Sequence, residues 1–287
     1  MKFNGCGTAL VTPFKNGAVD YKAYEDLVRR QVEAGVDFLV PLATTAETPT
    51  LSPREKRKIL RLTKKNCGSL PLLVGVGSNS VAGTLGNMKL CDFGADGFLV
   101  VVPFYNKPTQ QGQIAYFKEI ARHTTKPVFI YNVPGRTGAN MLPQTCLTLA
   151  REVENIVGIK EASGKLEQVE EICKGAGEGF TLLSGDDDLT LDMIRLGGKG
   201  AISVASNIAP QKVAQVIHLA LEGNLEKAAA CDKALAKLYK DCFIESNPIP
   251  VKAGLNHLGL CSAEMRLPLS EAQEQTKTEM ASCIDEL

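Results

Sequence analysis

The chain has 287 residues, enough for one large domain or two small ones, and its 44% hydrophobic and 22% charged residues are typical of globular proteins. This composition excludes a disordered or collagen-like chain. Its 32 Lys and Arg residues balance 32 Asp and Glu residues, so no net field attracts phosphate backbones or anionic lipid, and we expect neither nucleic acid nor a membrane as a partner.

Apolar runs are short, and the longest, around residues 97–104, is far below the roughly 18 residues of a membrane-spanning helix. The first residues lack the long apolar stretch of a secretory signal, so we expect a cytoplasmic protein. Nine cysteines without a Cys-x-x-Cys pair indicate reduced thiols rather than a disulfide framework. The three histidines have no second ligand at metal spacing, so we expect no metal site.

Apolar, β-branched runs followed by amphipathic stretches recur along the first two thirds of the chain. They predict eight strands, at residues 8–11, 37–42, 72–76, 97–102, 128–133, 156–161, 181–184 and 201–205. Their starts are spaced by roughly 28 residues, which suits a strand, a loop and a crossover helix. Asp20 and Ser52 stand at N-cap positions of two intervening helices, and Glu55 completes a capping box with Ser52.

This repeat predicts an α/β fold, a closed (β/α)8 TIM barrel, because closure covers both faces of the apolar strands. An open doubly wound sheet is the alternative, but Gly75-Val76-Gly77-Ser78-Asn79-Ser80 lacks the third glycine of a dinucleotide loop. After Pro210 only helices are predicted, at residues 212–222, 225–243, 251–258 and 270–284. We expect barrel strands and helices in residues 1–209, and the last barrel helix with a C-terminal helical appendage in residues 210–287, continuous with the barrel.

The strand predicted at residues 156–161 carries Lys160, the one lysine inside a predicted strand. Alternation places Ile156, Gly158 and Lys160 on one face, where Gly158 leaves room beside the lysine stem. An unpaired ammonium in the lumen would be costly, which favours the neutral amine, a nucleophile for carbonyl groups. The alternative is a lysine that pairs with Glu161 or reaches solvent.

Polar residues also follow the ends of other strands, where a barrel places its active site. Thr44, Tyr105 and Tyr131 offer hydroxyl groups that could carry protons, although packing is the commoner role of a tyrosine. Arg136 follows a Pro-Gly turn and would suit the carboxylate of an acidic substrate, with a solvated surface arginine as the alternative. The aspartates at 186–188 are expected to cap the next helix rather than to bind metal.

In combination, these motifs resemble those of the dihydrodipicolinate synthase (4-hydroxy-tetrahydrodipicolinate synthase) family, lyases of the pyruvate-dependent class I aldolase superfamily that includes N-acetylneuraminate lyase. The resemblance runs from Gly7-Thr8-Ala9-Leu10-Val11-Thr12-Pro13-Phe14 to Asn247-Pro248-Ile249-Pro250-Val251-Lys252. Its most specific parts are Thr44-Thr45 before Glu47, Tyr131-Asn132 and Gly158-Ile159-Lys160. It implies condensation of pyruvate with L-aspartate semialdehyde to 4-hydroxy-tetrahydrodipicolinate, in lysine and diaminopimelate biosynthesis, without metal or organic cofactor.

By this resemblance, Lys160 forms a Schiff base with pyruvate, and Tyr131, Thr44 and Tyr105 form the proton relay. The resemblance also implies that Tyr105 acts in the neighbouring subunit of a tight dimer, within a homotetramer. A monomer would then be nearly inactive.

The same resemblance assigns substrate binding. Thr45 and the backbone of Ile202 would hold pyruvate, and Arg136, in the loop Pro134-Gly135-Arg136-Thr137, would receive the carboxylate of the aldehyde. Two alternatives stay open. One is a pyruvate-dependent aldolase of sugar acids, such as an N-acetylneuraminate lyase, which would be indifferent to Arg136. The other is a noncatalytic barrel that binds small molecules.

Two departures from the family pattern have consequences. Ala43 and Ala46 replace its usual glycines, and a positive φ at either position would strain the loop that orients the two threonines. The His and Glu positions of the family's inhibitory lysine site align with Pro53, Lys56 and Gly83. We therefore expect weak or absent inhibition by lysine.

Overall fold

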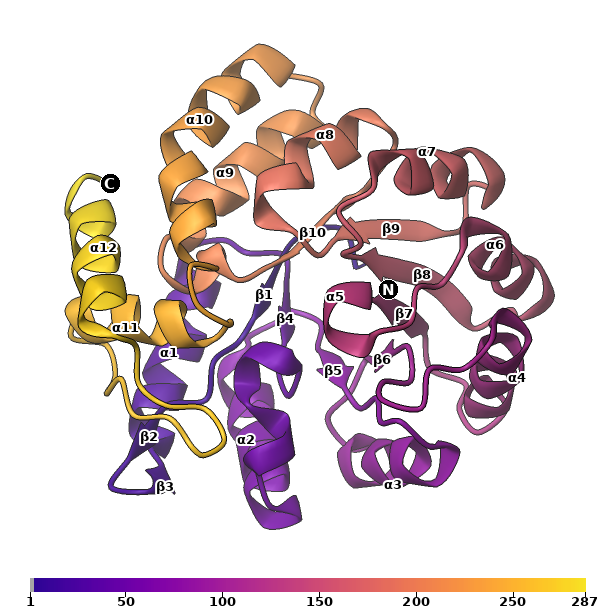
Figure 1. The fold of residues 1–287 in the computed structure, drawn as a ribbon, viewed down its shortest axis with the longest axis horizontal. Coiled ribbons are helices and arrows are strands. Elements are labelled where there is room, and N and C mark those ends of the chain that lie inside the picture. Colours follow the sequence, from indigo (N-terminus) through magenta and orange to yellow (C-terminus); the bar gives the residue numbers. More distant parts are fainter. Residues whose placement is uncertain (1–2) are drawn as a thin grey trace.

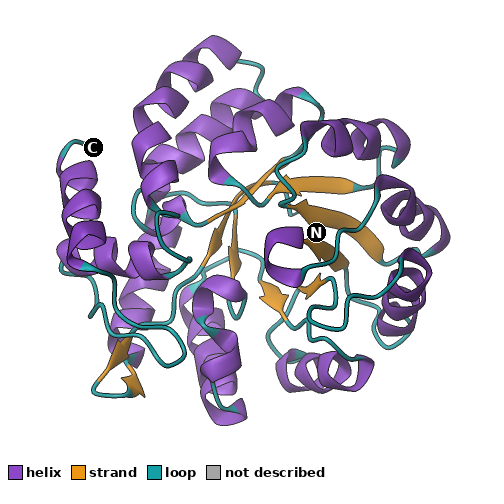
Figure 2. Cartoon of the chain, viewed as in Figure 1, coloured by secondary structure: helices purple, strands orange, loops and turns teal. Residues whose placement is uncertain are grey.

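The computed structural model describes residues 3–287 as an eight-stranded parallel sheet, rolled up and surrounded by helices (Figure 1, Figure 2). Its strands are β1 (Gly5–Ala9), β4 (Phe38–Val40), β5 (Leu73–Gly75), β6 (Gly97–Val101), β7 (Val128–Asn132), β8 (Ile156–Glu161), β9 (Thr181–Ser184) and β10 (Gly200–Ser203). The helices between and after them are α1 (Tyr21–Glu33), α2 (Pro53–Asn66), α3 (Val81–Cys91), α4 (Gln110–Ala121), α6 (Pro143–Glu152), α7 (Leu166–Gly175), α8 (Thr190–Arg195) and α9 (Pro210–Leu221). The predicted (β/α)8 barrel is confirmed.

The strands follow one another around the ring in the order β4-β1-β10-β9-β8-β7-β6-β5. The ring is completed between β4 and β5 by a parallel bridge that pairs Leu39 with Leu72. Two more hydrogen bonds cross there, from Leu39 N to the Pro71 carbonyl (3.1 Å) and from Gly75 N to the Pro41 carbonyl (3.0 Å). The β4/β5 seam is therefore thinner than the pairing of β7 with β6 and β8.

Aromatic rings fill the lower part of the lumen. Phe3 packs edge-on against Phe38 and Phe129, with ring centroids 5.6 and 5.5 Å apart. A Cβ atom at Gly158 would lie 2.4 Å from the Phe129 ring, so this glycine makes room for Phe129 rather than for the stem of Lys160. Aromatic packing therefore fills the lumen at the amino-terminal ends of the strands and leaves the carboxyl ends to polar side chains.

The local signals for helix starts are confirmed. Ser52 and Glu55 form both hydrogen bonds of the capping box at the start of α2, and the Asp20 side chain accepts from two N–H groups of α1. Other boundaries differ, because the predicted strand 8–11 is β1 at Gly5–Ala9. A short hairpin of β2 (Phe14–Lys15) and β3 (Ala18–Val19) was not predicted, since two-residue strands have no periodicity.

Three helices extend the chain beyond the barrel: α10 (Leu225–Asp241), α11 (Ile249–His257) and α12 (Glu274–Asp285). Helix α10 packs on α9, and α11 packs on α12. The segment between α11 and α12 runs towards the hairpin and the start of α2 (Figure 1). The predicted C-terminal helical appendage is confirmed, although its last helix begins four residues later than predicted. Within residues 3–287, no helix is both long and apolar enough to span a membrane.

Candidate active site

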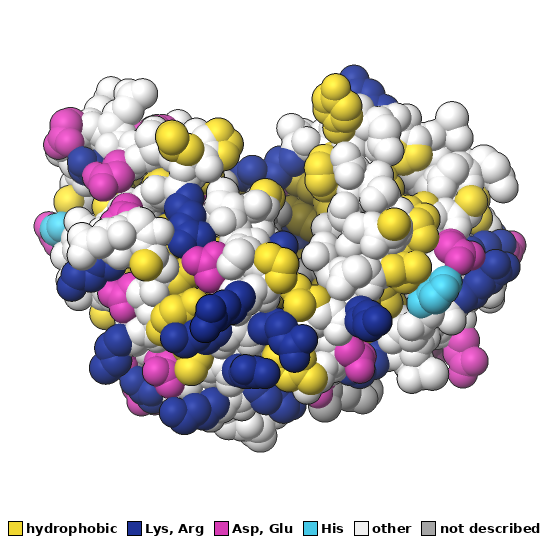
Figure 3. Space-filling view, turned by 90° about the horizontal axis from the view of Figure 1, so that it is seen from below, with side chains coloured by type: hydrophobic (Ala, Val, Ile, Leu, Met, Phe, Trp, Pro, Cys, Tyr) yellow, Lys and Arg dark blue, Asp and Glu magenta, His cyan; other side chains and the backbone are white. Residues whose placement is uncertain are grey.

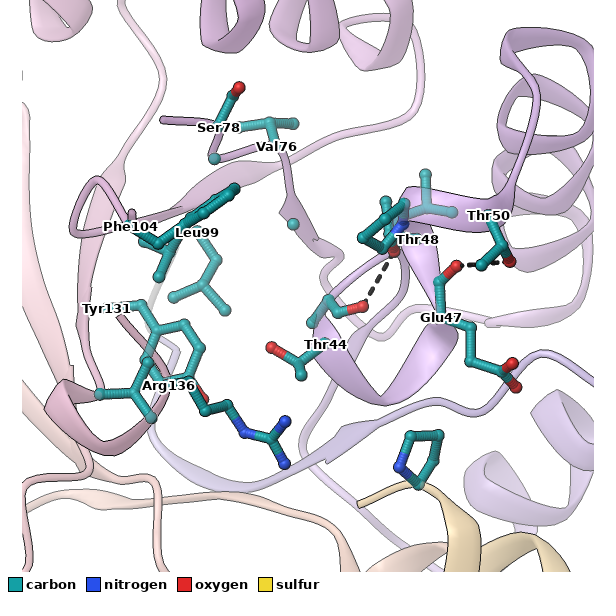
Figure 4. A pocket seen from close by; sticks show the side chains of 18 of the residues that line it. Thr44, Glu47, Thr48, Thr50, Val76, Ser78, Leu99, Phe104, Tyr131 and Arg136 are labelled. Carbon is teal, nitrogen blue, oxygen red and sulfur yellow. Dashed lines mark hydrogen bonds between the residues drawn. The ribbon is translucent and has the colours of Figure 1, made fainter. Parts of the chain in front are cut away.

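A cavity of about 540 Å³ opens at the carboxyl ends of the strands. Its lining combines strand ends of the barrel with the C-terminal segment, and includes Thr44, Val76, Tyr131, Arg136, Asn247 and Leu269. The side chains of Thr44, Tyr131 and Arg136 converge on this space (Figure 4). The space-filling view shows the molecule hollowed at its upper edge, with hydrophobic side chains on the walls of the hollow (Figure 3). The cavity lies where barrel enzymes bind their substrates.

Lys160 lies on β8 directly opposite Tyr131 of β7 and is only 4% exposed. Its Nζ atom lies 4.4 Å from the centroid of the Tyr131 ring, and this ring lines the cavity. A Cβ atom at Gly185 would lie 2.9 Å from Cε of Lys160, so the lysine stem passes close to the β9 end. The amine is therefore held just behind the cavity wall, out of bulk solvent.

The neighbouring Glu161 points away from Lys160, as the strand pleat requires. Its carboxylate accepts hydrogen bonds from Asn132 Nδ2 (3.0 and 3.2 Å), Gln168 Nε2 (3.0 Å) and Ser163 N (2.8 Å). Burial raises the pKa of the Glu161 carboxyl, and these hydrogen bonds oppose the shift. The alternatives in which Lys160 pairs with Glu161 or reaches solvent are therefore both excluded.

Two aspartates after β9 approach the same end of the lumen. Burial raises the pKa of Asp186 to about 6, against the opposing effect of the Lys160 charge. Asp187 Oδ2 accepts hydrogen bonds from Val204 N (3.0 Å) and Ala205 N (2.9 Å). The prediction that these aspartates cap the next helix is wrong, since Asp187 instead holds the turn that follows β10.

The loop after β4 places both threonines on a 3-10 turn, Thr44–Ala46. Thr45 is 2% exposed, and its Oγ1 accepts a hydrogen bond from Asn247 Nδ2 (3.1 Å). Ala43 has φ −88°, and the residues of this loop with positive φ are Leu42 (58°) and Glu47 (52°). The strain considered for Ala43 and Ala46 is therefore absent, because the left-handed positions flank the two alanines.

Arg136 lies on the short helix α5 (Pro134–Thr137) at the mouth of the cavity. Its Nη2 atom donates to the Asn247 carbonyl (3.2 Å). Asn247 thus contacts both Thr45 and Arg136, a role that sequence reasoning missed. The one available signal for this role was the position of Asn247 in the Asn-Pro-Ile-Pro motif. That signal was insufficient, because the residue type alone does not indicate a hydrogen-bond partner 202 residues away.

Four predicted site residues do not line the cavity: Lys160 and Thr45 lie buried beside it, and Tyr105 and Ile202 are placed elsewhere. Tyr105 has φ 72° on the loop after β6 and is 88% exposed. Ile202 on β10 is fully buried in the lumen, in one cluster with Tyr131 and Leu183. The chain by itself brings Lys160, Tyr131, Thr44, Thr45 and Arg136 together and leaves Tyr105 pointing outward.

Both the sequence and the fold of this chain are similar to those of known proteins. Residues 2–287 match the model of the "Dihydrodipicolinate synthetase family". The chain is 45% identical to the 4-hydroxy-tetrahydrodipicolinate synthase of Thermotoga neapolitana over 279 residues, which cover 96% of this chain and 95% of the relative. It is also 45% identical to the protein of that name from Oleidesulfovibrio alaskensis, with 96% of each chain covered.

Solved structures give the same result. The crystal structure of dihydrodipicolinate synthase from Thermotoga maritima superposes with a TM-score of 0.97 at 43% identity, covering 99% of this chain and 98% of that one. A structure described as the first monomeric dihydrodipicolinate synthase variant also has a TM-score of 0.97 at 43% identity, with 99% and 96% of the two chains covered.

Proposed function

The chain belongs to the dihydrodipicolinate synthetase family, and we propose that it condenses pyruvate with L-aspartate semialdehyde to 4-hydroxy-tetrahydrodipicolinate. It is a lyase of lysine and diaminopimelate biosynthesis, and its 45% identical relatives are named 4-hydroxy-tetrahydrodipicolinate synthase. The observation that carries the proposal is the buried amine of Lys160 against Tyr131, at a cavity that Arg136 also lines.

The first step joins pyruvate to Lys160. The neutral amine attacks the ketone carbon of pyruvate, a C–N bond forms, and the ketone oxygen leaves as water after it has been protonated. Thr45 and the backbone of Ile202 are proposed to hold the pyruvate carboxylate. Tyr131, whose ring contacts the lysine, is proposed to give and take the protons of this step.

The second step forms the carbon–carbon bond. The imine withdraws electrons, so a methyl proton of the bound pyruvate can leave and give an enamine. The enamine carbon adds to the aldehyde carbon, and the aldehyde oxygen takes up a proton through the relay of Tyr131, Thr44 and Tyr105. The amino group of the semialdehyde then attacks the imine carbon, which closes the ring and releases Lys160. One water is lost over the whole reaction.

Arg136 favours this aldehyde over a sugar acid. A guanidinium at the cavity mouth presents parallel donors that match the carboxylate of L-aspartate semialdehyde. The contact with the Asn247 carbonyl uses one of its five N–H donors and leaves the others for substrate.

Self-association is part of the proposal. Tyr105 is 88% exposed in the single chain, and we propose that it reaches the cavity of a second copy of the chain. We therefore propose a tight dimer, within a tetramer, in the cytoplasm. Analytical ultracentrifugation alongside activity on dilution tests this, and full activity in a purely monomeric sample would contradict it.

Borohydride reduction with pyruvate, followed by peptide mass mapping, tests the covalent step. We expect a mass increment on Lys160 in the wild-type protein and in Lys165→Ala, which removes an exposed lysine nearby. Lys160→Ala should not be labelled and should lose about 10⁴-fold or more of kcat. Labelling at another lysine would overturn the assignment.

Turnover of candidate substrates separates the three functions. Pyruvate with L-aspartate semialdehyde should give the heterocycle, and N-acetylneuraminate should not be cleaved. Cleavage of N-acetylneuraminate would favour a sugar-acid aldolase, and labelling of Lys160 without turnover of either substrate would favour a noncatalytic binding barrel.

A further inference from the structure

The loop that carries Thr44 and Thr45 reverses at Glu47, a residue that is not glycine but has φ 52°. Its N–H donates to the Thr44 carbonyl (3.0 Å), and its carbonyl accepts from Thr50 N and Thr50 Oγ1 (both 2.9 Å). A left-handed backbone is unfavourable for such a residue and persists only where its surroundings fix it. Glu47 must therefore be held by more than its own loop.

The side chain of Glu47 is held by Lys252 from the far end of the chain. Lys252 lies on α11, and its Nζ atom is 2.8 Å from Glu47 Oε1, with both side chains at 0% exposure. The ammonium also donates to the Glu264 carbonyl and lies 4.4 Å from the centroid of the Phe14 ring. Its three N–H groups thus have three partners, so the charge is buried but not left without compensation.

The second carboxylate oxygen of Glu47 is used as well. It accepts a hydrogen bond from Arg266 N (3.1 Å), in the segment between α11 and α12. The Arg266 guanidinium donates to the Thr50 carbonyl (3.1 Å) and pairs with Glu55 (2.6 Å), at the start of α2. The C-terminal segment thus holds the threonine loop at Glu47 and at Thr50.

From this arrangement we propose that Lys252 is a positioning residue for the reaction, acting through Glu47 to set the places of Thr44 and Thr45. Lys252 does not line the cavity, and its ammonium is enclosed by Glu47, the Glu264 carbonyl and the Phe14 ring. It fixes the carboxylate at the point where the loop turns, and the two threonines precede that point by three and two residues. The inference rests on the proposed function, because the readouts are those of pyruvate chemistry.

The experiment compares Lys252→Met, Glu47→Gln and the double variant E47Q/K252M with the wild-type protein. Each single variant leaves one buried partner uncompensated, whereas the double variant removes both charges and should recover most of the melting temperature. Tyr24→Phe is the stability control, because it removes a buried hydrogen bond to Thr63 (2.7 Å) far from the loop.

We expect the double variant to keep a kcat about 10- to 100-fold below wild type, because a small misplacement of reacting groups costs that much. Its KM for pyruvate should rise, while its KM for the aldehyde stays within about twofold, since Arg136 is not held by Lys252. Borohydride labelling of Lys160 by pyruvate should also be slower. Tyr24→Phe should lower the melting temperature and leave all three kinetic readouts unchanged.

A double variant that regains both melting temperature and kcat would overturn the proposal, as would an equal kcat loss in Tyr24→Phe. If the double variant does not fold, Phe14→Leu is assayed instead. It removes the aromatic face but leaves both charges, and it should lower kcat about 3- to 10-fold. An unchanged kcat in a folded Phe14→Leu protein then overturns the proposal. A wild-type protein that is not labelled by pyruvate contradicts the proposed function instead.

Discussion

Two neighbouring parts of the site, strand β8 and the loop after β4, are built in opposite ways. Around Lys160, strand β8 pairs in parallel with both β7 and β9, beyond a register shift near its start, so the local pleat aims the amine at the lumen. The loop after β4 carries Thr44 and Thr45 on a 3-10 turn between residues with positive φ, and it depends on Asn247 and Lys252. A strand places a side chain with local geometry, whereas the loop requires contacts from 200 residues away.

This contrast predicts that a strand group such as Tyr131 acts on the chemical steps alone, whereas groups on the segments that follow the strands, including Arg136 on α5, also serve substrate binding. The effects below test that division in order of decreasing size.

Tyr131→Phe has the largest expected effect, a loss of about 10²- to 10⁴-fold in kcat, because a hydroxyl that transfers protons is removed while the ring against Lys160 remains. Steady-state kinetics at saturating substrates measures it. Tyr116→Phe is the matched control, since its hydroxyl bonds to Thr84 and Ser78 rather than lining the cavity. Unchanged kcat in Tyr131→Phe would remove the tyrosine from the relay.

Arg136→Ala should raise the KM for L-aspartate semialdehyde by about 10- to 100-fold, because the variant loses a charge-assisted contact to the substrate carboxylate. The KM for pyruvate should change little. Arg122→Ala, which changes an exposed arginine on the outer surface, serves as the control. A fall in kcat with constant KM would break the division between strand and loop groups.

Asp186→Asn should stabilise the protein at neutral pH by about 1 to 2 kcal/mol. The pKa of this aspartate is raised from 3.8 to about 6 in the fold, so protonation favours the folded state below pH 3.8, and this benefit is lost as pH rises through 6. The variant should melt about 2 to 5 °C above wild type at pH 7.5, and the difference should shrink as the pH falls towards 3.8. Asp188→Asn, at the neighbouring exposed site, is the matched control.

Free lysine added to the assay should have the smallest effect. We expect it to change the rate by less than about twofold at a millimolar concentration, because Pro53, Lys56 and Gly83 offer no carboxylate for its amino groups. Initial rates with increasing lysine measure this. Half-maximal inhibition below a millimolar concentration would contradict it.

The sequence predicted what local geometry determines. The alternation of Gly158, Ile159 and Lys160 placed Lys160 towards the lumen, and the Ser52 to Glu55 spacing predicted the start of α2. The prediction that Ile156 shares the face of Lys160 is wrong, because a register shift between β7 and β8 puts Ile156 in the core cluster of Val128 and Ile159. These signals lie within a few residues of one another, so no knowledge of the rest of the chain is needed.

The sequence did not predict what distant contacts determine. Glu47 and Lys252 are 205 residues apart, and neither has a neighbour in sequence that marks it as buried. Positive φ values at the loops around the site include those of Leu42, Glu47 and Tyr105, where no glycine signals a left-handed turn. Residues that hold others in place have no chemical signature of their own, which is why Asn247 and Lys252 were missed.

The thin seam between β4 and β5 has a consequence for how the barrel opens. Since Leu39 and Leu72 form the bridge that completes the ring there, backbone amides of these two strands should exchange with deuterium before those of β7 and β8. The first breathing motion of the ring would then begin a few residues before Thr44. Opening of the barrel at this seam would therefore displace Thr44 of the proposed proton relay before it disturbed Lys160 on β8.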